Sequence, residues 1–252
     1  SPHGGPPAQI EKERSITMSL EENIRKVFDN MAQAAREAGR DPGEITLVAA
    51  TKVQTDETIR AAIAAGVPIC GENRVQEMTA HLETDAYAGA QLHFIGHLQT
   101  NKVKNVVGRV DMIESVGSVH LLEAVEKQAA KLDIVQDILL EVNVGGEESK
   151  SGITPDQVEE VAKLTLTMPH VRLRGLMAIP LVAGEDGNRG FFREMYQLYV
   201  DIKQKMVDNN GDINCLSMGM SGDYMEAIRQ GATLVRVGTA LFGPRPPMGT
   251  QA

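Results

Sequence analysis

The stretch Ile45-Thr46-Leu47-Val48-Ala49-Ala50-Thr51-Lys52 sets the pattern that decides the fold. Its apolar and β-branched residues predict a buried strand, and a helical segment follows from Thr55. Lys52 would then stand where a parallel strand ends, which is the edge where such folds place ligands. A lysine partly withdrawn from water loses its proton easily and can form a Schiff base with an aldehyde. The alternative is a solvated lysine just beyond a strand.

Strand-like and helix-like segments alternate along the chain. A leading helix is expected to begin with a capping box at Ser19 and Glu22 and to end at Gly39. Eight strands are then expected, at Ile45–Ala50, Val67–Cys70, Leu92–Ile95, Asp111–Glu114, Ile138–Asn143, Val171–Ala178, Ile213–Ser217 and Leu234–Val237. Seven helices are expected between them, at Thr55–Ala65, Arg74–Leu82, Gln99–Val107, Ser118–Leu132, Pro155–Leu166, Phe191–Val207 and Asp223–Gln230. This α/β pattern predicts a single (β/α)8 TIM barrel with an extra N-terminal helix, rather than an open sheet with a G-x-G-x-x-G turn.

The barrel is expected to occupy residues 18–245 as one domain. Residues 1–17 are rich in glycine and proline at their start, and we expect a disordered tail or a non-native remnant, with Met18 as a natural start. Residues 246–252 are expected to form a short C-terminal tail. The segment Leu181–Gly190 contains three glycines and is the one expected to be mobile.

The composition of the chain argues against several classes of protein. The chain has 252 residues and a net charge of −9, which argues against broad nucleic-acid binding. No apolar run reaches the ~18 residues that a membrane span requires, and the start lacks the apolar core of a secretion signal, so none is expected. Two cysteines without paired spacing favour a reducing compartment, so we expect a cytoplasmic protein. His93 and His97 flank a strand-to-loop segment and do not share a helix face, so no metal site is expected.

Two turns near the C-terminus are rich in glycine and hydroxyl groups. They are Ser217–Asp223, between a strand and a helix, and Val237–Ala240, at the end of the last strand. In α/β barrels the loops after strands seven and eight frequently bind phosphate, because glycine lets the backbone approach and N–H and hydroxyl groups donate. The alternative for each is an ordinary strand-to-helix turn.

Three further residues are candidates for the same end of the barrel. Alternation predicts that Arg236 points into the barrel if its valine neighbours face the helices, and its buried charge then needs a carboxylate or a ligand acceptor. Asn73 is expected either to cap the next helix or to line the site. Met177 is expected either in the core or in contact with a ligand.

Seven segments, in order, strongly resemble one known family, the pyridoxal phosphate homeostasis proteins, which are also described as alanine racemase N-terminal-domain-like. The resemblance runs from about Met18 to Gly243. The segments are Thr51-Lys52, Gly71-Glu72-Asn73, His93–Gly96, Lys150–Ile153, Arg174–Met177, Leu216–Ser221 and Val235–Gly243.

The resemblance implies a fold-type III barrel that carries pyridoxal 5′-phosphate, and it gives several residues a role. Lys52 matches the lysine that forms the Schiff base with the cofactor. Arg236 matches the arginine that faces the pyridine nitrogen, and Asn73 and Met177 match positions beside the ring. The expected phosphate-binding positions are Ser217, Gly238 and Thr239, with backbone groups near Met220 and Ser221.

The resemblance implies a monomeric cofactor-binding protein, not an enzyme, that supplies or buffers pyridoxal phosphate for apo-enzymes. One alternative is an amino-acid racemase of weak or narrow activity. Racemisation needs a second acid or base opposite the lysine, and in alanine racemases a tyrosine from an added β domain fills that role. Here no such domain is expected after Gly243, and only Tyr224 of the four tyrosines lies near a site turn. Another alternative is a Schiff-base aldolase that acts on a phosphorylated sugar.

Overall fold

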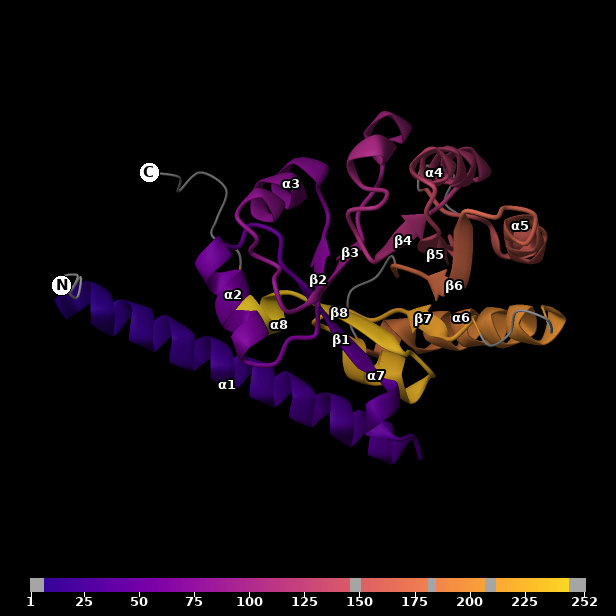
Figure 1. The fold of residues 1–252 in the computed structure, drawn as a ribbon. Helices are drawn as coiled ribbons and strands as arrows, with labels where there is room; N and C mark the ends of the chain where they lie inside the picture. Colours follow the sequence, from indigo (N-terminus) through magenta and orange to yellow (C-terminus); the bar gives the residue numbers. More distant parts are fainter. Residues whose placement is uncertain (1–6, 146–150, 181–184, 207–211, 245–252) are drawn as a thin grey trace.

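Eight parallel strands close into a barrel in the computed structural model (Figure 1). The structure describes residues 7–145, 151–180, 185–206 and 212–244. Each strand pairs with the next, and β8 pairs with β1 to close the ring. The strands are β1 (Thr46–Ala50), β2 (Ile69–Glu72), β3 (Gln91–Phe94), β4 (Met112–Val116), β5 (Gln136–Glu141), β6 (Val171–Met177), β7 (Cys215–Ser217) and β8 (Leu234–Val237). The predicted barrel and its eight strands are therefore confirmed.

Helices surround the barrel, and side-chain caps define where some of them begin. Thr55 accepts a hydrogen bond from the Thr58 N–H at the start of α2, and Ser118 does the same for Leu121 in α4. The α-helices are α1 (Pro7–Glu37), α2 (Asp56–Ala64), α3 (Val75–Glu83), α4 (Val119–Leu132), α5 (Val158–Thr165), α6 (Glu185–Lys205), α7 (Tyr224–Arg229) and α8 (Thr239–Phe242). Three 3-10 turns accompany them, η1 (Pro42–Glu44), η2 (Thr100–Asn105) and η3 (Pro155–Gln157). None of the helices in these described ranges combines the length and apolar character needed to cross a membrane.

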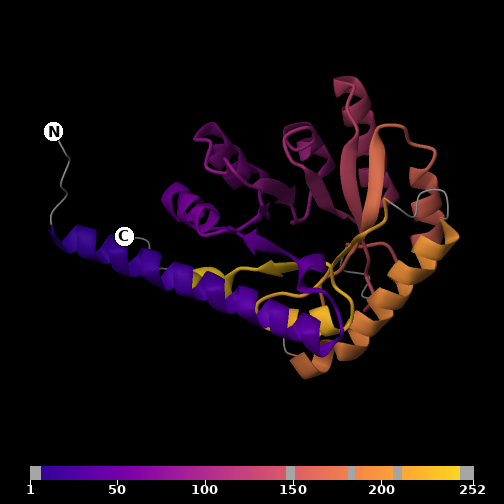
Figure 2. The same ribbon diagram turned by 60° about the horizontal axis from the view of Figure 1, so that its bottom comes forward.

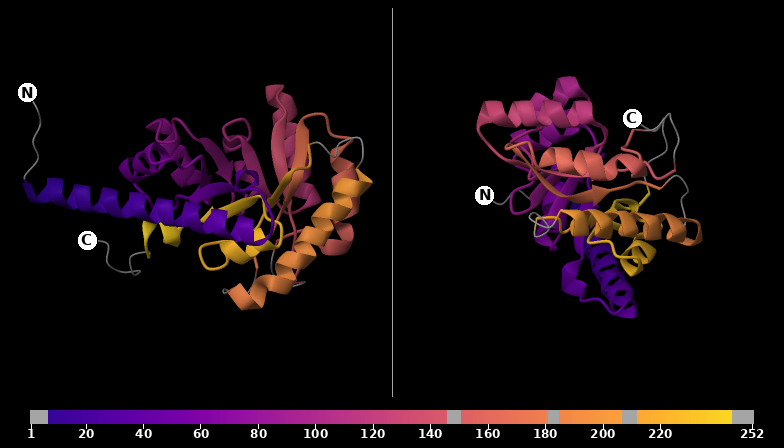
Figure 3. Two further views of the ribbon diagram at one scale, coloured as in Figure 1. Left: turned by 90° about the horizontal axis from the view of Figure 1, so that it is seen from below. Right: turned by 90° about the vertical axis from the view of Figure 1, so that its right-hand side faces the viewer.

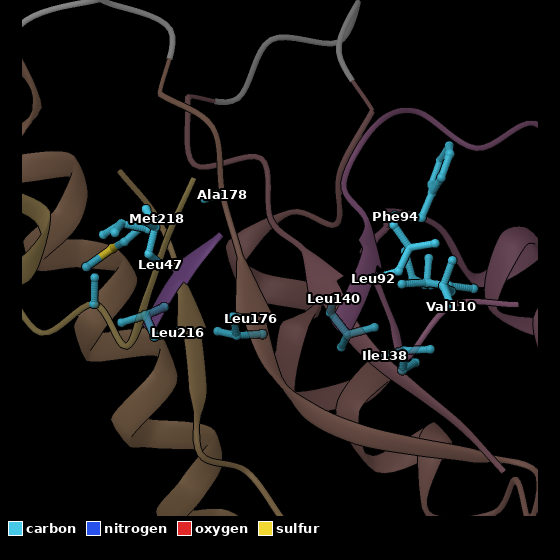
Figure 4. Close-up of a cluster of buried hydrophobic side chains, with 14 of the residues drawn as sticks. Leu47, Leu92, Phe94, Val110, Ile138, Leu140, Leu176, Ala178, Leu216 and Met218 are labelled. Carbon is cyan, nitrogen blue, oxygen red and sulfur yellow. The ribbon is translucent and has the colours of Figure 1, made fainter. Parts of the chain in front are cut away.

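Strand alternation divides the buried side chains into two sets. One set faces the helices and includes Leu47 of β1, Leu140 of β5, Leu176 of β6 and Leu216 of β7, which Figure 4 labels. The other set fills the barrel interior with six buried residues, Val48, Ile69, Met112, Leu139, Met177 and Leu234. Because successive residues of a strand point to opposite faces, one strand can contribute to both sets, as β1 does with Leu47 and Val48.

The two longest helices, α1 and α6, lie on the outside of the barrel (Figures 2 and 3). Helix α1 buries a stripe at helical spacing, which includes Ile24, Val27 and Met31. Asn23 Nδ2 donates to the Leu241 carbonyl oxygen over 3.0 Å, which ties this helix to α8. The N-terminal turns of α1 are exposed and extend past the barrel.

The structure differs from the sequence expectations in three places. Helix α1 begins at Pro7, so the expected start at Ser19 is wrong and residues 7–17 are helical rather than a tail. Proline at a first helical position, followed by Ala, Gln, Glu and Lys, favours this earlier start. The helix expected at Gln99–Val107 is the shorter 3-10 turn η2. Residues 185–190 of the segment expected to be mobile belong to α6, and residues 181–184 lie outside the described residues.

Candidate functional site

Lys52 lies directly after β1, at the end of the barrel where all the strands finish. Its side chain is half-buried. The neighbouring Thr51 points away from the interior, toward Glu72, which leaves Lys52 on the interior side of the turn. A Cβ added at Gly238 would lie 3.4 Å from the Ala50 Cβ, so the end of β8 packs against the end of β1. Lys52 and the turn after β8 therefore share one mouth of the barrel.

A buried carboxyl group anchors the turn that carries Lys52. Glu72 is fully buried, and its Oε1 accepts hydrogen bonds from Thr51 Oγ1 (2.5 Å) and from the Tyr87 hydroxyl (2.8 Å). Burial raises the pKa of Glu72, against the opposing effect of these two hydrogen bonds. Among the described residues, its second oxygen, Oε2, has no hydrogen-bond partner. The protonated acid therefore predominates further up the pH scale than in an exposed glutamate.

Val53, the residue after Lys52, has an unusual backbone conformation. Its φ is +61°, a value that β-branched residues rarely adopt, and its side chain is 61% exposed. The Val53 N–H donates a hydrogen bond to Glu77 of α3. Backbone strain of this kind persists only where surrounding contacts impose it, and it concentrates at ligand sites.

Asn73 does not cap α3, and that expectation is wrong. The N-cap position is Arg74, which makes no side-chain cap hydrogen bond. Asn73 Oδ1 is buried and has no hydrogen-bond partner among the described residues. A Cβ at Gly96 would lie 2.2 Å from the Asn73 carbonyl oxygen, so only glycine permits this close approach. Asn73 is thus held close to Gly96, and its contact with a ligand stays a prediction.

The two glycine- and hydroxyl-rich turns lie together, as their positions after β7 and β8 predict. Ser221 Oγ accepts hydrogen bonds from the N–H groups of Gly238 (3.2 Å) and Ala240 (3.1 Å). The Met220 N–H donates to Asp223 Oδ1 over 2.7 Å, which fixes the first turn, and the Met220 side chain is 43% exposed. Thr239 is exposed at the start of α8. These contacts brace the turns, and the phosphate-binding role of their residues stays a prediction.

Arg236 points into the barrel, as alternation predicts, and is 4% exposed. Its Nη1 donates to Ser217 Oγ over 2.6 Å, and its Nη2 donates to the Ala178 carbonyl oxygen over 2.9 Å. Ser217 Oγ in turn donates to Glu114 Oε1 over 2.5 Å. Since the Ser217 hydroxyl is already engaged twice, any phosphate contact through it competes with these bonds.

Glu114 carries the compensating charge inside the barrel. It is fully buried, and its Oε2 lies 2.7 Å from His93 Nδ1. Burial opposes ionisation, but the His93 hydrogen bond and the charges of His93 and Arg236 hold the pKa of Glu114 below its usual value. Burial lowers the pKa of Arg236, against the opposing charges of Glu114 and Glu141.

Met177 is fully buried in the apolar interior set, beside Val48 and Leu139. It forms part of the barrel interior beneath the mouth, so the structure supports its core role. Its expected contact with a cofactor ring stays a prediction.

Sequence reasoning missed the roles of Glu72, Tyr87, Glu114 and His93. A signal was available for the two acids, because each lies in an otherwise apolar strand segment, where a charged residue is rarely buried without a partner. The identities of the partners required the fold.

Comparisons with known proteins identify the relatives of this chain. The profile of the family described as alanine racemase, N-terminal domain, matches residues 22–246. The pyridoxal phosphate homeostasis protein of Aquifex aeolicus is 40% identical over 229 residues, which cover 90% of this chain and 99% of the relative. The chain belongs to the pyridoxal phosphate homeostasis protein family.

Two solved structures extend the family comparison. The crystal structure of an unknown protein from Bifidobacterium adolescentis is 39% identical in sequence, with a TM-score of 0.85 and coverage of 90% of this chain and 96% of that one. PipY of Synechococcus elongatus, with PLP bound, is 32% identical, with a TM-score of 0.73 and coverage of 84% of this chain and 100% of PipY. The barrel is therefore shared with these two proteins across nearly their whole length.

Proposed function

We propose that the protein binds pyridoxal 5′-phosphate, holds it as a Schiff base on Lys52, and supplies or buffers it for cytoplasmic apo-enzymes. The observation that carries this proposal is the placement of half-buried Lys52 at the same mouth as the paired turns after β7 and β8. Pyridoxal phosphate supplies an aldehyde that condenses with an amine and a phosphate that accepts several hydrogen bonds. The names of the relatives and the PLP bound to PipY support the choice of ligand.

The residues at the mouth fit this group. Asn73 Oδ1 is a buried acceptor without a partner among the described residues, as expected where a ligand supplies the donor. Thr239 offers an exposed hydroxyl beside Gly238 for the phosphate, while Ser221 holds the turn. Arg236 places a fixed cation in the interior for the ring nitrogen, with donors that remain beyond its bonds to Ser217 and Ala178.

The placement of the tyrosines supports carriage over racemisation. Tyr224, the one expected nearest the site, is buried and its hydroxyl accepts a hydrogen bond from Asn30 Nδ2 of α1 over 3.0 Å. Tyr87 donates to Glu72, and Tyr199 donates to the Ile213 carbonyl oxygen. The Tyr196 ring packs against Gly231, before β8 and at the other end of the barrel. The hydroxyls of Tyr87, Tyr199 and Tyr224 are thus engaged with the protein instead of facing Lys52 as an acid or base.

The first experiment is to add pyridoxal phosphate, reduce with borohydride and map the labelled peptide. We expect the label on the peptide that contains Lys52 and no label in Lys52→Ala. Lys102→Ala, in the exposed part of η2 near the mouth, is the matched control and should label as the parent does. A label that persists in Lys52→Ala at the parent level would overturn the assignment.

A second experiment separates supply from racemisation. The loaded protein is mixed with an apo-enzyme that requires pyridoxal phosphate, and the recovery of that enzyme's activity is followed. We expect recovery to track the amount of loaded protein. In parallel, the loaded protein is incubated with L-alanine, and D-alanine formation at ordinary enzyme turnover would favour the racemase alternative.

A further inference from the structure

A chain of hydrogen bonds crosses the barrel interior behind the candidate site. It runs from Arg236 through Ser217 to Glu114 and then to His93. The four residues come from β8, β7, β4 and β3, and each is at most 4% exposed. Strands on both sides of the interior therefore contribute to one buried polar unit.

This chain of hydrogen bonds explains how the buried guanidinium of Arg236 is tolerated. In the described part of the molecule, no ion pair joins Arg236 directly to a carboxylate, and its nearest hydrogen-bonded acid is Glu114, through the Ser217 hydroxyl. An uncompensated buried charge is costly, so Glu114 has to remain ionised for Arg236 to keep its position. The indirect connection also leaves Arg236 donors unclaimed by a carboxylate on the side of the mouth.

We propose that Glu114 and His93 are positioning residues for the cofactor site, which act through Ser217 to hold Arg236 and to set the electrostatic potential at the ring end. This inference rests on the proposed function, because it assigns these residues an effect on the group that Arg236 faces. A structural ion pair alone would stabilise the barrel without changing the properties of a ligand on Lys52.

His93 also links this unit to the opposite end of the barrel. It lines a cavity of about 400 Å³ there, together with residues at the N-terminal ends of the strands, such as Thr46 and Gln91. His93 is itself only 3% exposed, so the cavity borders the buried unit without opening it to solvent.

Other charged groups lie near the hydrogen-bonded residues and contribute to the net charge around Arg236. Glu141 of β5 and Asp223, beside α7, add negative charge near Arg236. The titratable and charged residues that line the same cavity as His93 are Asp111, Asp137, Arg174 and Cys215. Asp137 is already paired with Arg174, with Nη1 of the arginine 3.0 Å from Oδ2 of the aspartate. Glu114 is the only one of these acids that is hydrogen-bonded to both Ser217 and His93 among the described residues.

The test uses Glu114→Gln, which keeps the shape and removes the charge. The loaded protein is titrated with acid and base, and the pH midpoint of the Schiff-base absorbance change is measured. Removing a negative charge makes the protonated Schiff base less favourable, so the midpoint should fall by roughly 0.5–1 unit, less than a direct neighbour would cause. The matched control is Glu126→Gln, because Glu126 Oε1 also bonds a histidine, His170, over 3.0 Å but lies outside this chain.

His93→Gln is the second variant and keeps a side-chain donor for Glu114 without a titratable ring. We expect its midpoint to differ from the parent's as well, because an amide replaces the ring that is hydrogen-bonded to Glu114. If Glu114→Gln does not fold, as judged by circular dichroism, His93→Gln decides the question. If the midpoints in both variants equal those of the parent and Glu126→Gln, the inference is overturned while the proposed function stands. Absence of a Schiff base in the parent itself would overturn the proposed function instead.

Discussion

The two sides of the barrel mouth are built in opposite ways. On the β1–β2 side, Val53 has a strained backbone, and Glu72 Oε2 and Asn73 Oδ1 are buried without partners among the described residues. On the β7–β8 side, Ser221 satisfies two N–H groups of the next turn, and Arg236 is bonded at two nitrogens. Unmet hydrogen bonds and strain mark where a ligand changes the protein most. Under the proposed function, the β1–β2 side would supply the reactive amine, and the β7–β8 side would supply a preformed anchor for the phosphate.

The largest expected effect is from Lys52→Ala, which removes the reactive group but not the anchor. We expect complete loss of the borohydride-reducible bond, with weaker, reversible binding of pyridoxal phosphate retained through the β7–β8 turns. Equilibrium dialysis measures the retained binding. If the variant binds no pyridoxal phosphate at all while its fold is intact, the two sides do not act separately.

Thr239→Ala should weaken the anchor and leave the reactive side unchanged. Loss of one hydroxyl donor to a charged acceptor costs about 1.5–3 kcal/mol, or roughly a 10–150-fold weaker dissociation constant. The measurement is best made in the Lys52→Ala background, where covalent bonding does not mask the change. Thr239→Ser retains the hydroxyl and should bind like its parent; equal affinity in the alanine variant would contradict the role.

Glu72→Gln should change how stability depends on pH. Burial raises the pKa of Glu72 in the folded protein, so the folded state binds a proton more tightly than the unfolded state. Its favourable contribution is present below the unfolded value near 4.5 and is lost as the pH rises through the folded value. We expect the parent to lose stability relative to the glutamine variant across that window in denaturant titrations. Glu83→Gln, at an exposed position of α3, is the control, and an identical response in both variants would argue against a buried acid.

Val53→Asn should produce the smallest effect. Asparagine tolerates positive φ better than valine, so relief of backbone strain should stabilise the protein by about 0.5–1 kcal/mol. Thermal unfolding of the apo-protein measures this gain. Val53→Thr retains the β-branch and should show no gain; a destabilised asparagine variant would indicate that the valine side chain itself makes a needed contact.

Sequence alone predicted the fold because its signals are local. Alternation along β8 correctly placed Arg236 in the interior, and the glycine-rich turns were correctly assigned to one end of the barrel. The end of a strand can be predicted from its run of apolar residues and the turn that follows. The same local signals failed at Ser19, where a capping motif lies within a longer helix. They also failed at Asn73, a typical capping residue, because the N-cap position of α3 is Arg74.

The polar partners could not be predicted in the same way. Ser217 and Glu114 are 103 residues apart, and their hydrogen bond exists only because strands β4 and β7 enclose the same interior. Glu72 has the same limitation, since Tyr87 reaches it from beyond α3. An acid in an apolar strand signals that a partner exists but does not identify it.

The pairing of β8 with β1 has a consequence for biosynthesis. These strands align Thr46 through Ala49 with Leu234 through Val237, so the first and last strands must meet before the mouth exists. During translation Lys52 leaves the ribosome long before the turn at Gly238, and non-local pairing of this kind forms late. A nascent chain that has not yet formed β8 therefore lacks one side of the mouth. Under the proposed function, Lys52 would meet the complete site only after the barrel has closed, so its occupancy would follow completed folding.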